Sequence, residues 1–266
     1  MKPFAVAGLL VATVVAGLPT PAPAQPAKDP RPKLVMLIAG QSYETDRTLP
    51  AFAARFLEAQ FRVVICEGAM TNPANRFERS EEIADADILV VSVWRRAPPK
   101  EQLNLIRRHV ESGKPVVGIA TSSHAFTLRQ GASPASGSQD WPEWGPRVIG
   151  ANYTSHHPIR FITTVTAMDP ADPLLAGVTL PFTSKMELNL VRPLSPGAHA
   201  FLTGTIEGQA PEPVAWTFQH YGGGKTFFTP LGHPEDFTNP AFQRLLLNGI
   251  RWAAGLPVTA ADPRKR

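Results

Sequence analysis

Cysteine is almost absent from this chain, which has a single thiol, Cys66, among its 266 residues. One thiol cannot form an intramolecular disulfide, so the fold depends on a packed core. Cys66 ends an apolar run at residues 62–66, and no neighbouring pattern marks a lowered thiol pKa. We therefore expect a buried structural cysteine rather than a reactive one.

An excess of positive charge is missing from the body of the chain, although the whole sequence has a net charge of +4. Seven of its 26 basic residues and two of its 22 acidic residues lie outside residues 34–258, which leaves 19 basic and 20 acidic side chains in the body. The basicity belongs to the two ends. A body without a basic stripe argues against nucleic acid as a partner.

The chain also lacks an apolar run long enough to cross a bilayer as a mature helix. Its best candidate, residues 4–18, follows a basic start at Met1-Lys2 and precedes the small residues of 22–24. This order is typical of a secretory signal peptide, which we predict over residues 1–24. An uncleaved membrane anchor is the alternative, but the helix would be broken by Pro19, Pro21 and Pro23.

Cleavage of this segment would give an exported protein, periplasmic or secreted, without stable membrane insertion. We expect a flexible Pro-rich arm at residues 25–32, one domain at 33–258 and a basic tail at 259–266. A single domain is favoured because no linker-like stretch divides the middle of the chain.

The first half of the domain alternates apolar runs with amphipathic segments. Strands are predicted at 33–39, 61–66, 87–93 and from 114 onward, and helices at 48–59, 80–84 and 100–112. The first helix is expected to open at Thr48-Leu49-Pro50, with Pro50 near its first turn. This alternation predicts right-handed βαβ crossovers and an α/β fold with a mostly parallel sheet.

The second half of the domain is less regular. Residues 131–144 predict a long ordered loop, and strands are predicted at 160–165, 198–203, 214–218 and 226–229. The triple glycine at 222–224 predicts a hairpin turn rather than a phosphate loop, because no helix start follows it. The final helix is expected to begin at Pro240, after the N-cap Asn239.

The central strand stops abruptly at residues 118–124 (GIATSSH), which is typical of a strand-to-helix elbow. A nucleophile elbow needs Ser or Cys at its tip, and this chain has Ala120 there. We expect the hydroxyls of Thr121, Ser122 and Ser123 to cap the next helix rather than to attack a substrate. The obvious nucleophile is therefore missing.

Six spaced motifs run in order over nearly the whole mature chain. They are residues 41–50 (QSYETDRTLP), 92–96 (SVWRR), 114–126 (KPVVGIATSSHAF), 150–157 (GANYTSHH), 231–233 (LGH) and 237–242 (FTNPAF). Together they resemble the trehalose-utilisation (ThuA-like) family. The resemblance implies a flavodoxin-like, class I glutamine-amidotransferase-like three-layer sandwich, in a family associated with trehalose and keto-sugar metabolism. The amidotransferase cysteine would fall at Ala120, so glutamine hydrolysis is not expected.

Four of the seven histidines lie in these motifs: His124, His156, His157 and His233. Each follows a predicted strand or sits in a long loop, and loops at the carboxyl ends of parallel strands meet above the sheet. Glu187 resembles the acidic position of the family. We predict His124, Glu187 and His233 as catalytic acid, base or metal ligands.

Two chemistries stay open for this group. His156 and His157, with His124 or His233, are candidate ligands for a divalent metal such as zinc, with an open position for water. No short ligand spacing supports this choice, and acid/base catalysis by His and Glu without a metal is the alternative. A third interpretation is that these residues bind sugar hydroxyls or only fix loops.

Further residues in these segments are predicted to bind substrate: Tyr43, Glu44, Arg95, Arg96, Tyr153 and Asp236. The two arginines follow a strand end and could recognise an anionic or polyhydroxylated ligand. Tyr153, with Trp141 and Trp144, could stack on a sugar ring or could pack the long loop onto the body.

The sequence thus predicts an exported protein of carbohydrate metabolism that cleaves or isomerises a (keto-)glycoside related to trehalose, as a hydrolase, lyase or isomerase. The alternative is a noncatalytic carbohydrate-binding module on an inactive amidotransferase-like scaffold. We expect a small-molecule carbohydrate as partner, and a homodimer is compatible with the sequence.

Overall fold

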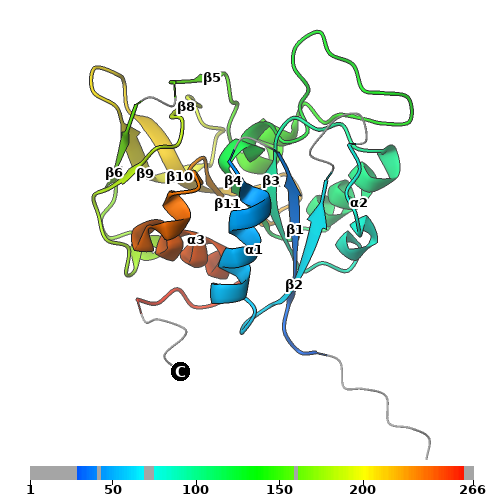
Figure 1. Cartoon of the computed structure of the whole chain (residues 1–266), viewed down its shortest axis with the longest axis horizontal. Helices are drawn as coiled ribbons and strands as arrows, with labels where there is room; N and C mark the ends of the chain where they lie inside the picture. Colours follow the sequence, from blue (N-terminus) through cyan, green and yellow to red (C-terminus); the bar gives the residue numbers. More distant parts are fainter. Residues whose placement is uncertain (1–28, 41–42, 69–74, 159–160, 261–266) are drawn as a thin grey trace, which may run out of the picture. The chain divides into compact units, whose positions relative to one another are not determined.

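The computed structural model describes residues 29–40, 43–68, 75–158 and 161–260. The chain divides into Met1–Pro30 and Arg31–Arg266, and the second unit holds all the elements described below (Figure 1). The predicted signal peptide and most of the predicted basic tail lie outside the described residues. Within the described ranges, every helix is too short or too polar to span a membrane.

One nine-stranded sheet organises this unit, in the order β2-β1-β3-β4-β11-β10-β9-β6-β7. Its strands are β1 (Lys33–Ala39), β2 (Arg62–Glu67), β3 (Ile88–Val93), β4 (Val116–Ile119), β6 (Thr163–Ala167), β7 (Phe182–Ser184), β9 (His199–Thr205), β10 (Glu212–Gln219) and β11 (Lys225–Thr229). A separate pair, β5 (Ser155–His156) and β8 (Asn189–Leu190), forms a two-stranded antiparallel sheet.

The half of the sheet from β2 to β11 is parallel throughout. With β11 as its fifth strand, its order is that of flavodoxin-like folds. Every residue of β1, β3 and β4 is buried, as expected of strands covered on both faces, which must be apolar along their whole length. The predicted α/β fold and these strands are confirmed.

The other half of the sheet, from β11 to β7, is antiparallel. The sheet is therefore mixed, and its parallel character belongs to the strands nearest the amino terminus together with β11. The glycines at 222–224 form the predicted hairpin turn between β10 and β11. Glycine is required at 222 because a Cβ there would lie 2.0 Å from the carbonyl oxygen of Val110.

Helices cover both faces of the sheet and make three layers. On one face lie α1 (Thr45–Phe56) and α3 (Pro240–Ala253), and on the other lie α2 (Lys100–Glu111) and the segment 141–149 (Figure 1). The alternation along β1 feeds both layers: Leu34 and Met36 pack in the first core, whereas Val35 and Leu37 pack in the second.

The predictions for the starts of two helices have different outcomes. The predicted N-cap of α3 is confirmed, because the Asn239 side chain accepts a hydrogen bond from the Ala241 N–H. The predicted start of α1 is wrong: this helix begins three residues earlier, at Thr45, after Glu44 in the left-handed conformation (φ 48°). Pro50 therefore lies inside the helix, where it cannot donate a backbone hydrogen bond.

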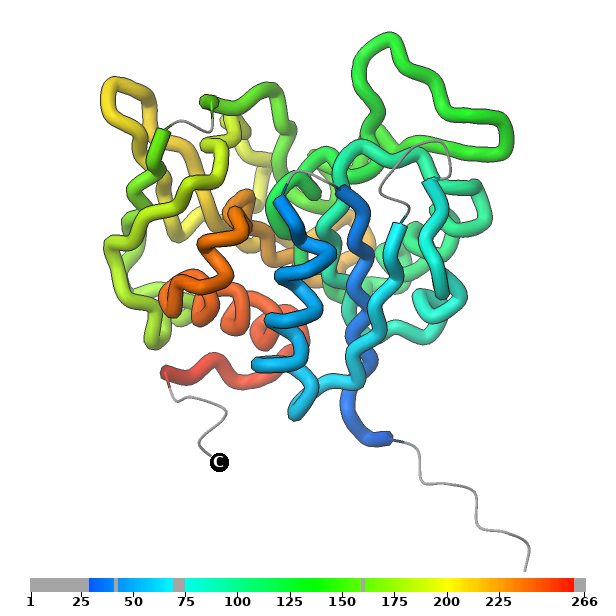
Figure 2. The backbone as a smooth tube through the Cα atoms, in the orientation of Figure 1, coloured from blue at the N-terminus to red at the C-terminus, as the bar shows by residue number. Residues whose placement is uncertain are grey.

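The long loop predicted at 131–144 is present, as the green excursion in Figure 2 shows, and no helix or strand interrupts it. Trp141 and Trp144 fasten its end to the body, since both are buried and the Trp144 indole donates a 2.7 Å hydrogen bond to the Ser122 carbonyl. They pack the loop rather than present a stacking surface. Cys66 is buried as predicted, and burial raises the pKa of its thiol to about 11.

Candidate functional site

The elbow after β4 keeps a nucleophile-elbow backbone without a nucleophile. Ala120, which opens the 3₁₀ helix Ala120–His124, has a φ of 55°, in the left-handed region that disfavours residues with a Cβ. The capping prediction is wrong, because no side chain caps this helix. Thr121 and Ser122 instead donate to the carbonyls of Val93 and Ile119. The hydroxyls thus hold the elbow to the sheet.

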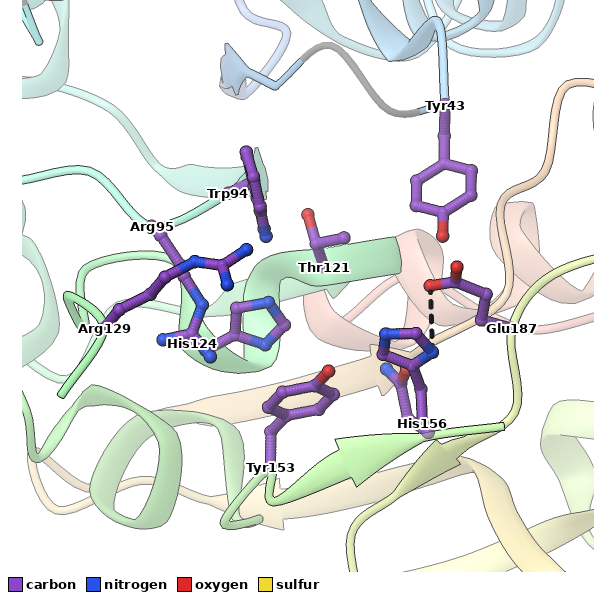
Figure 3. Close-up of a pocket in the computed structure, with 10 residues that line it drawn as sticks. Tyr43, Trp94, Arg95, Thr121, His124, Arg129, Tyr153, His156 and Glu187 are labelled. Atoms are coloured by element: carbon purple, nitrogen blue, oxygen red, sulfur yellow. Dashed lines mark ion pairs between the residues drawn. The ribbon is translucent and has the colours of Figure 1, made fainter. Parts of the chain in front are cut away.

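A cavity of about 330 Å³ opens beside this elbow (Figure 3). This volume lies within the range of about 300–1,000 Å³ found for small-molecule sites. It is lined by Tyr43, Trp94, Arg95, Thr121, His124, Arg129, Tyr153, His156, Glu187 and Asn189. The first five follow the carboxyl ends of β1, β3 and β4, where the strand order reverses and open α/β sheets bind their ligands.

One end of the cavity holds an acid/base group of three side chains. Nδ1 of His156 lies 3.5 Å from Oε2 of Glu187 and 3.2 Å from the carbonyl oxygen of His157. Both neighbours are acceptors, so Nδ1 carries the proton and Nε2 is the basic nitrogen. Burial and a hydrogen bond to Glu187 raise the pKa of the Tyr43 phenol. Pairing of β5 with β8 sets His156 opposite Asn189 and so brings Glu187 to this end.

His124 lies near the middle of the lining and stays neutral. Its side chain is only 7% exposed, and burial, with the nearby Arg95 charge, lowers its pKa to about 3. The Ser123 hydroxyl lies 3.1 Å from Nδ1 and can donate to it, which leaves the proton on Nε2. The imidazole also stacks on Tyr153, with ring centroids 4.1 Å apart. A neutral imidazole held in this way is a hydrogen-bond donor for a ligand.

The other end of the cavity is cationic. The Arg95 guanidinium lies 5.8 Å from the Tyr153 ring, and that of Arg129 lies 5.6 Å from the Trp94 ring. Nη1 of Arg95 donates to the carbonyls of Thr127 and Leu128, at 3.1 and 3.4 Å. Figure 3 shows both guanidinium groups on the side of His124 away from Glu187.

Five of the predicted site residues are not among those that line the cavity. Glu44 is exposed and forms an ion pair with Arg47. Arg96 is buried, and its backbone N–H donates to the carbonyl of Ala125. The backbone N–H of His157 donates to the Leu188 carbonyl, which ties its loop to the Glu187 segment.

His233 and Asp236 belong to a second cluster, in the loop after β11. The Asp236 carboxylate is 2% exposed, and its Oδ2 accepts from the N–H groups of Gly232 and His233 and from the Ser184 hydroxyl. Nδ1 of His233 accepts from the Glu235 N–H at 3.2 Å. Asp236 thus joins two loops through Oδ2. The predicted convergence of His233 with His124 and Glu187 on one cavity is not found.

The donor set for a metal is incomplete in the described part of the chain. No group of three or more His, Cys, Asp or Glu residues there lies close enough to hold a metal ion. His156 and Glu187 are adjacent, but no third ligand joins them in the described residues. The described residues therefore do not fit a three-ligand zinc site, and the divalent metal stays a prediction.

Four of the residues that line the cavity were not predicted as site residues from the sequence. Trp94 and Thr121 lie one and two residues after strand ends, and this position could have marked both of them. Arg129 lies between the Ala120–His124 helix and the long loop, and Asn189 lies in a two-residue strand, where no periodic pattern is visible. Only tertiary contacts place the last two in the site.

The strand order, the elbow and a polar cavity at the carboxyl edge define a flavodoxin-like α/β protein whose elbow lacks a nucleophile. Residues 35–253 match the family ThuA, described as trehalose utilisation. The chain belongs to this family, as its motifs predicted.

Solved structures agree with this assignment of the fold. A ThuA-like protein from Bacteroides uniformis ATCC 8492 has a TM-score of 0.59 and 14% identity, covering 86% of this chain and 95% of its own. One from Parabacteroides merdae ATCC 43184 has a TM-score of 0.57 and 19% identity, covering 86% and 92%. None of the curated proteins compared with the chain matches it.

Proposed function

We propose that this protein binds a carbohydrate in the cavity and cleaves or isomerises it by acid/base chemistry, with a glycoside or keto-glycoside related to trehalose as substrate. One observation carries the proposal: Glu187 lies against His156 and bonds to Tyr43 at one end of a cavity that also holds a neutral His124. Membership of a trehalose-utilisation family supports a sugar as the ligand.

In this proposal each of these groups has a role. In a keto-glycoside, the hydrogen on the carbon next to the ketone is acidic, and the Glu187 carboxylate is the base that takes it. The electron pair moves onto the ketone oxygen, where Nε2–H of His124 donates a hydrogen bond to the developing charge. Re-formation of the ketone expels the glycosidic oxygen from the next carbon, and the proton held by Glu187 returns to that oxygen.

His156 and Tyr43 act through the carboxylate. His156 lies within ion-pair distance of Glu187 and Tyr43 is hydrogen-bonded to it, and these two contacts orient the carboxylate. The proposal thus replaces His233 of the original trio by His156.

The substitution Glu187→Gln tests this proposal, because it keeps the size of the side chain and removes the base. We expect kcat on a keto-glycoside to fall by about 10²–10⁴-fold, the usual contribution of a general base, while affinity for the sugar is retained. Glu44→Gln is the matched control, since Glu44 is an exposed glutamate that follows Tyr43 and does not line the cavity. Full turnover by Glu187→Gln would reject the assigned base.

The noncatalytic alternative has its own signature. A carbohydrate-binding module would bind keto-glycosides and parent sugars in calorimetry and would show no turnover with any of them. Elemental analysis of the mature protein, after incubation with divalent metals and removal of the excess, tests the predicted metal.

Export is the second part of the proposal, supported by the basic start, apolar run and small residues of 1–24. We expect the mature protein to begin at Gln25 and to be released with the periplasmic or secreted fraction, which amino-terminal sequencing checks. An intact Met1 in a membrane fraction would favour the uncleaved anchor.

A further inference from the structure

The two ends of the cavity differ in charge. Glu187 is the only carboxylate among the residues that line it, and it lies with His156 and Tyr43. Arg95 and Arg129 lie at the opposite end, beside Trp94 and Tyr153 (Figure 3). His124, between the two ends, is neutral, so the arginines are the charged groups at their end of the cavity.

Neither guanidinium has an acidic partner in the described part of the chain, where every ion pair within 4.0 Å involves other residues. They are also close enough to repel each other, since burial and then the charge of Arg129 lower the pKa of Arg95. Arg129 is exposed, but Arg95 is half-buried, and a half-buried charge without a counter-ion is costly unless a ligand supplies one.

The protein fixes these cations in place. Arg95 has a left-handed backbone (φ 46°), and its Nη1 is bound by the two carbonyls of the 127–128 loop. Arg129 follows the same loop and lies over the Trp94 ring. The carbonyl contacts hold the Arg95 side chain in position, so it loses little side-chain freedom when an anion binds.

We propose that the ligand of this cavity is an anionic carbohydrate, whose carboxylate or phosphate group binds between Arg95 and Arg129. This inference rests on the proposed function and names its substrate class. Guanidinium groups form short, charge-assisted hydrogen bonds with both kinds of oxyanion. The reverse orientation would set the anion against Glu187, so the charges also direct the reacting carbon toward the acid/base end.

The test compares ligands that differ in a single group. D-glucuronate and D-glucose share the ring and differ in having a carboxylate or a hydroxymethyl group, and D-glucose 6-phosphate supplies the phosphate form. By calorimetry at low salt, we expect one of the anionic sugars to bind at least about tenfold more tightly than glucose, with an affinity that falls as salt is added. The tighter of the two anions identifies the oxyanion.

Substitution of Arg129 locates the anion. Arg129→Gln should lower the affinity for the anionic sugar about tenfold and leave the affinity for glucose unchanged. Arg147→Gln is the matched control, because Arg147 is also an exposed arginine over an aromatic ring, that of Tyr221 at 4.1 Å, outside the cavity lining. It should change neither affinity.

The outcomes separate this inference from the proposed function. Equal affinity for glucuronate, glucose 6-phosphate and glucose, or no binding of either anion at millimolar concentration, overturns the anionic subsite. If Glu187→Gln still abolishes turnover in that case, the proposed catalysis stands. Anion binding that depends on Arg129, together with full turnover by Glu187→Gln, supports the subsite and rejects the catalytic assignment.

Discussion

The parallel half of the large sheet and the small β5–β8 sheet contribute different parts of one cavity. Short loops after the parallel strands β3 and β4 bring Arg95 and His124 to the site. Of the acid/base pair, His156 lies in the two-residue strand β5, and Glu187 lies between β7 and β8, two residues before β8 begins.

The side chains of the two groups are therefore supported differently. The parallel strands are buried on both faces, and the residues at their ends are held by the core below them. His156 instead lies in an exposed two-residue strand, which is placed by its pairing with β8 and by the contact of the His157 N–H with Leu188. The same parallel scaffold can therefore support a different reaction when these segments change.

The largest effect is expected at Asp236, which forms the junction between the loop after β11 and the segment that leads to Glu187. This carboxylate joins the loop after β11 to Ser184, whose Oγ also accepts the Met186 N–H just before Glu187. Asp236→Ala leaves three buried donors without an acceptor, so we expect the free energy of unfolding in urea to fall by about 4 kcal/mol.

A suitable control for this measurement is Asp169→Ala. Asp169 is exposed, and its Oδ1 accepts a hydrogen bond from the Ala171 N–H. Its loss should cost about 1 kcal/mol or less. Similar losses for the two variants would show that the junction does not depend on Asp236.

The pH dependence of stability probes the parallel half through His124. The pKa of its imidazole is lowered to about 3 by burial, so between pH 6.5 and 3 the unfolded chain binds a proton that the folded chain does not. Stability contributed by the neutral ring is fully present above pH 6.5 and is lost as the pH falls. From pH 6.5 to 4 this loss should reach about 3 kcal/mol.

Urea unfolding of wild type and His124→Asn across that range measures the effect. The asparagine variant lacks the titrating group, so its stability should fall less steeply with acid by about this amount. Parallel curves for the two proteins would mean that His124 is solvated in the folded state.

The smallest expected effect concerns the backbone of the elbow. Ala120 has a φ of 55°, which glycine adopts without strain, whereas Ala125 nearby has helical angles (φ −51°, ψ −47°). Ala120→Gly should therefore raise stability by up to about 1 kcal/mol, and Ala125→Gly should lower it by about 1 kcal/mol. Thermal unfolding of both variants compares them, and a lower Tm for Ala120→Gly would show that the elbow is not strained.

The sequence by itself determined the parallel half of the fold and the start of α3. Continuous apolar runs specify buried strands at β1, β3 and β4, and Asn239-Pro240 specifies a helix start, because both signals are local. It also located Arg95 and His124, since residues that follow parallel strands meet at one edge of the sheet. The start of α1 was missed, because the left-handed Glu44 that precedes it has no such local signature.

Only the tertiary structure decided which polar groups share the cavity. His156 meets Glu187 through the pairing of two-residue strands, which are too short to show a period, and Arg129 arrives from a loop of 20 residues between the Ala120–His124 helix and the Gly145–Ile149 turn. His233 shared the same kind of motif, yet its loop turns onto Asp236. Convergence of distant side chains depends on loop paths, and these are set by buried hydrogen bonds that no single segment encodes.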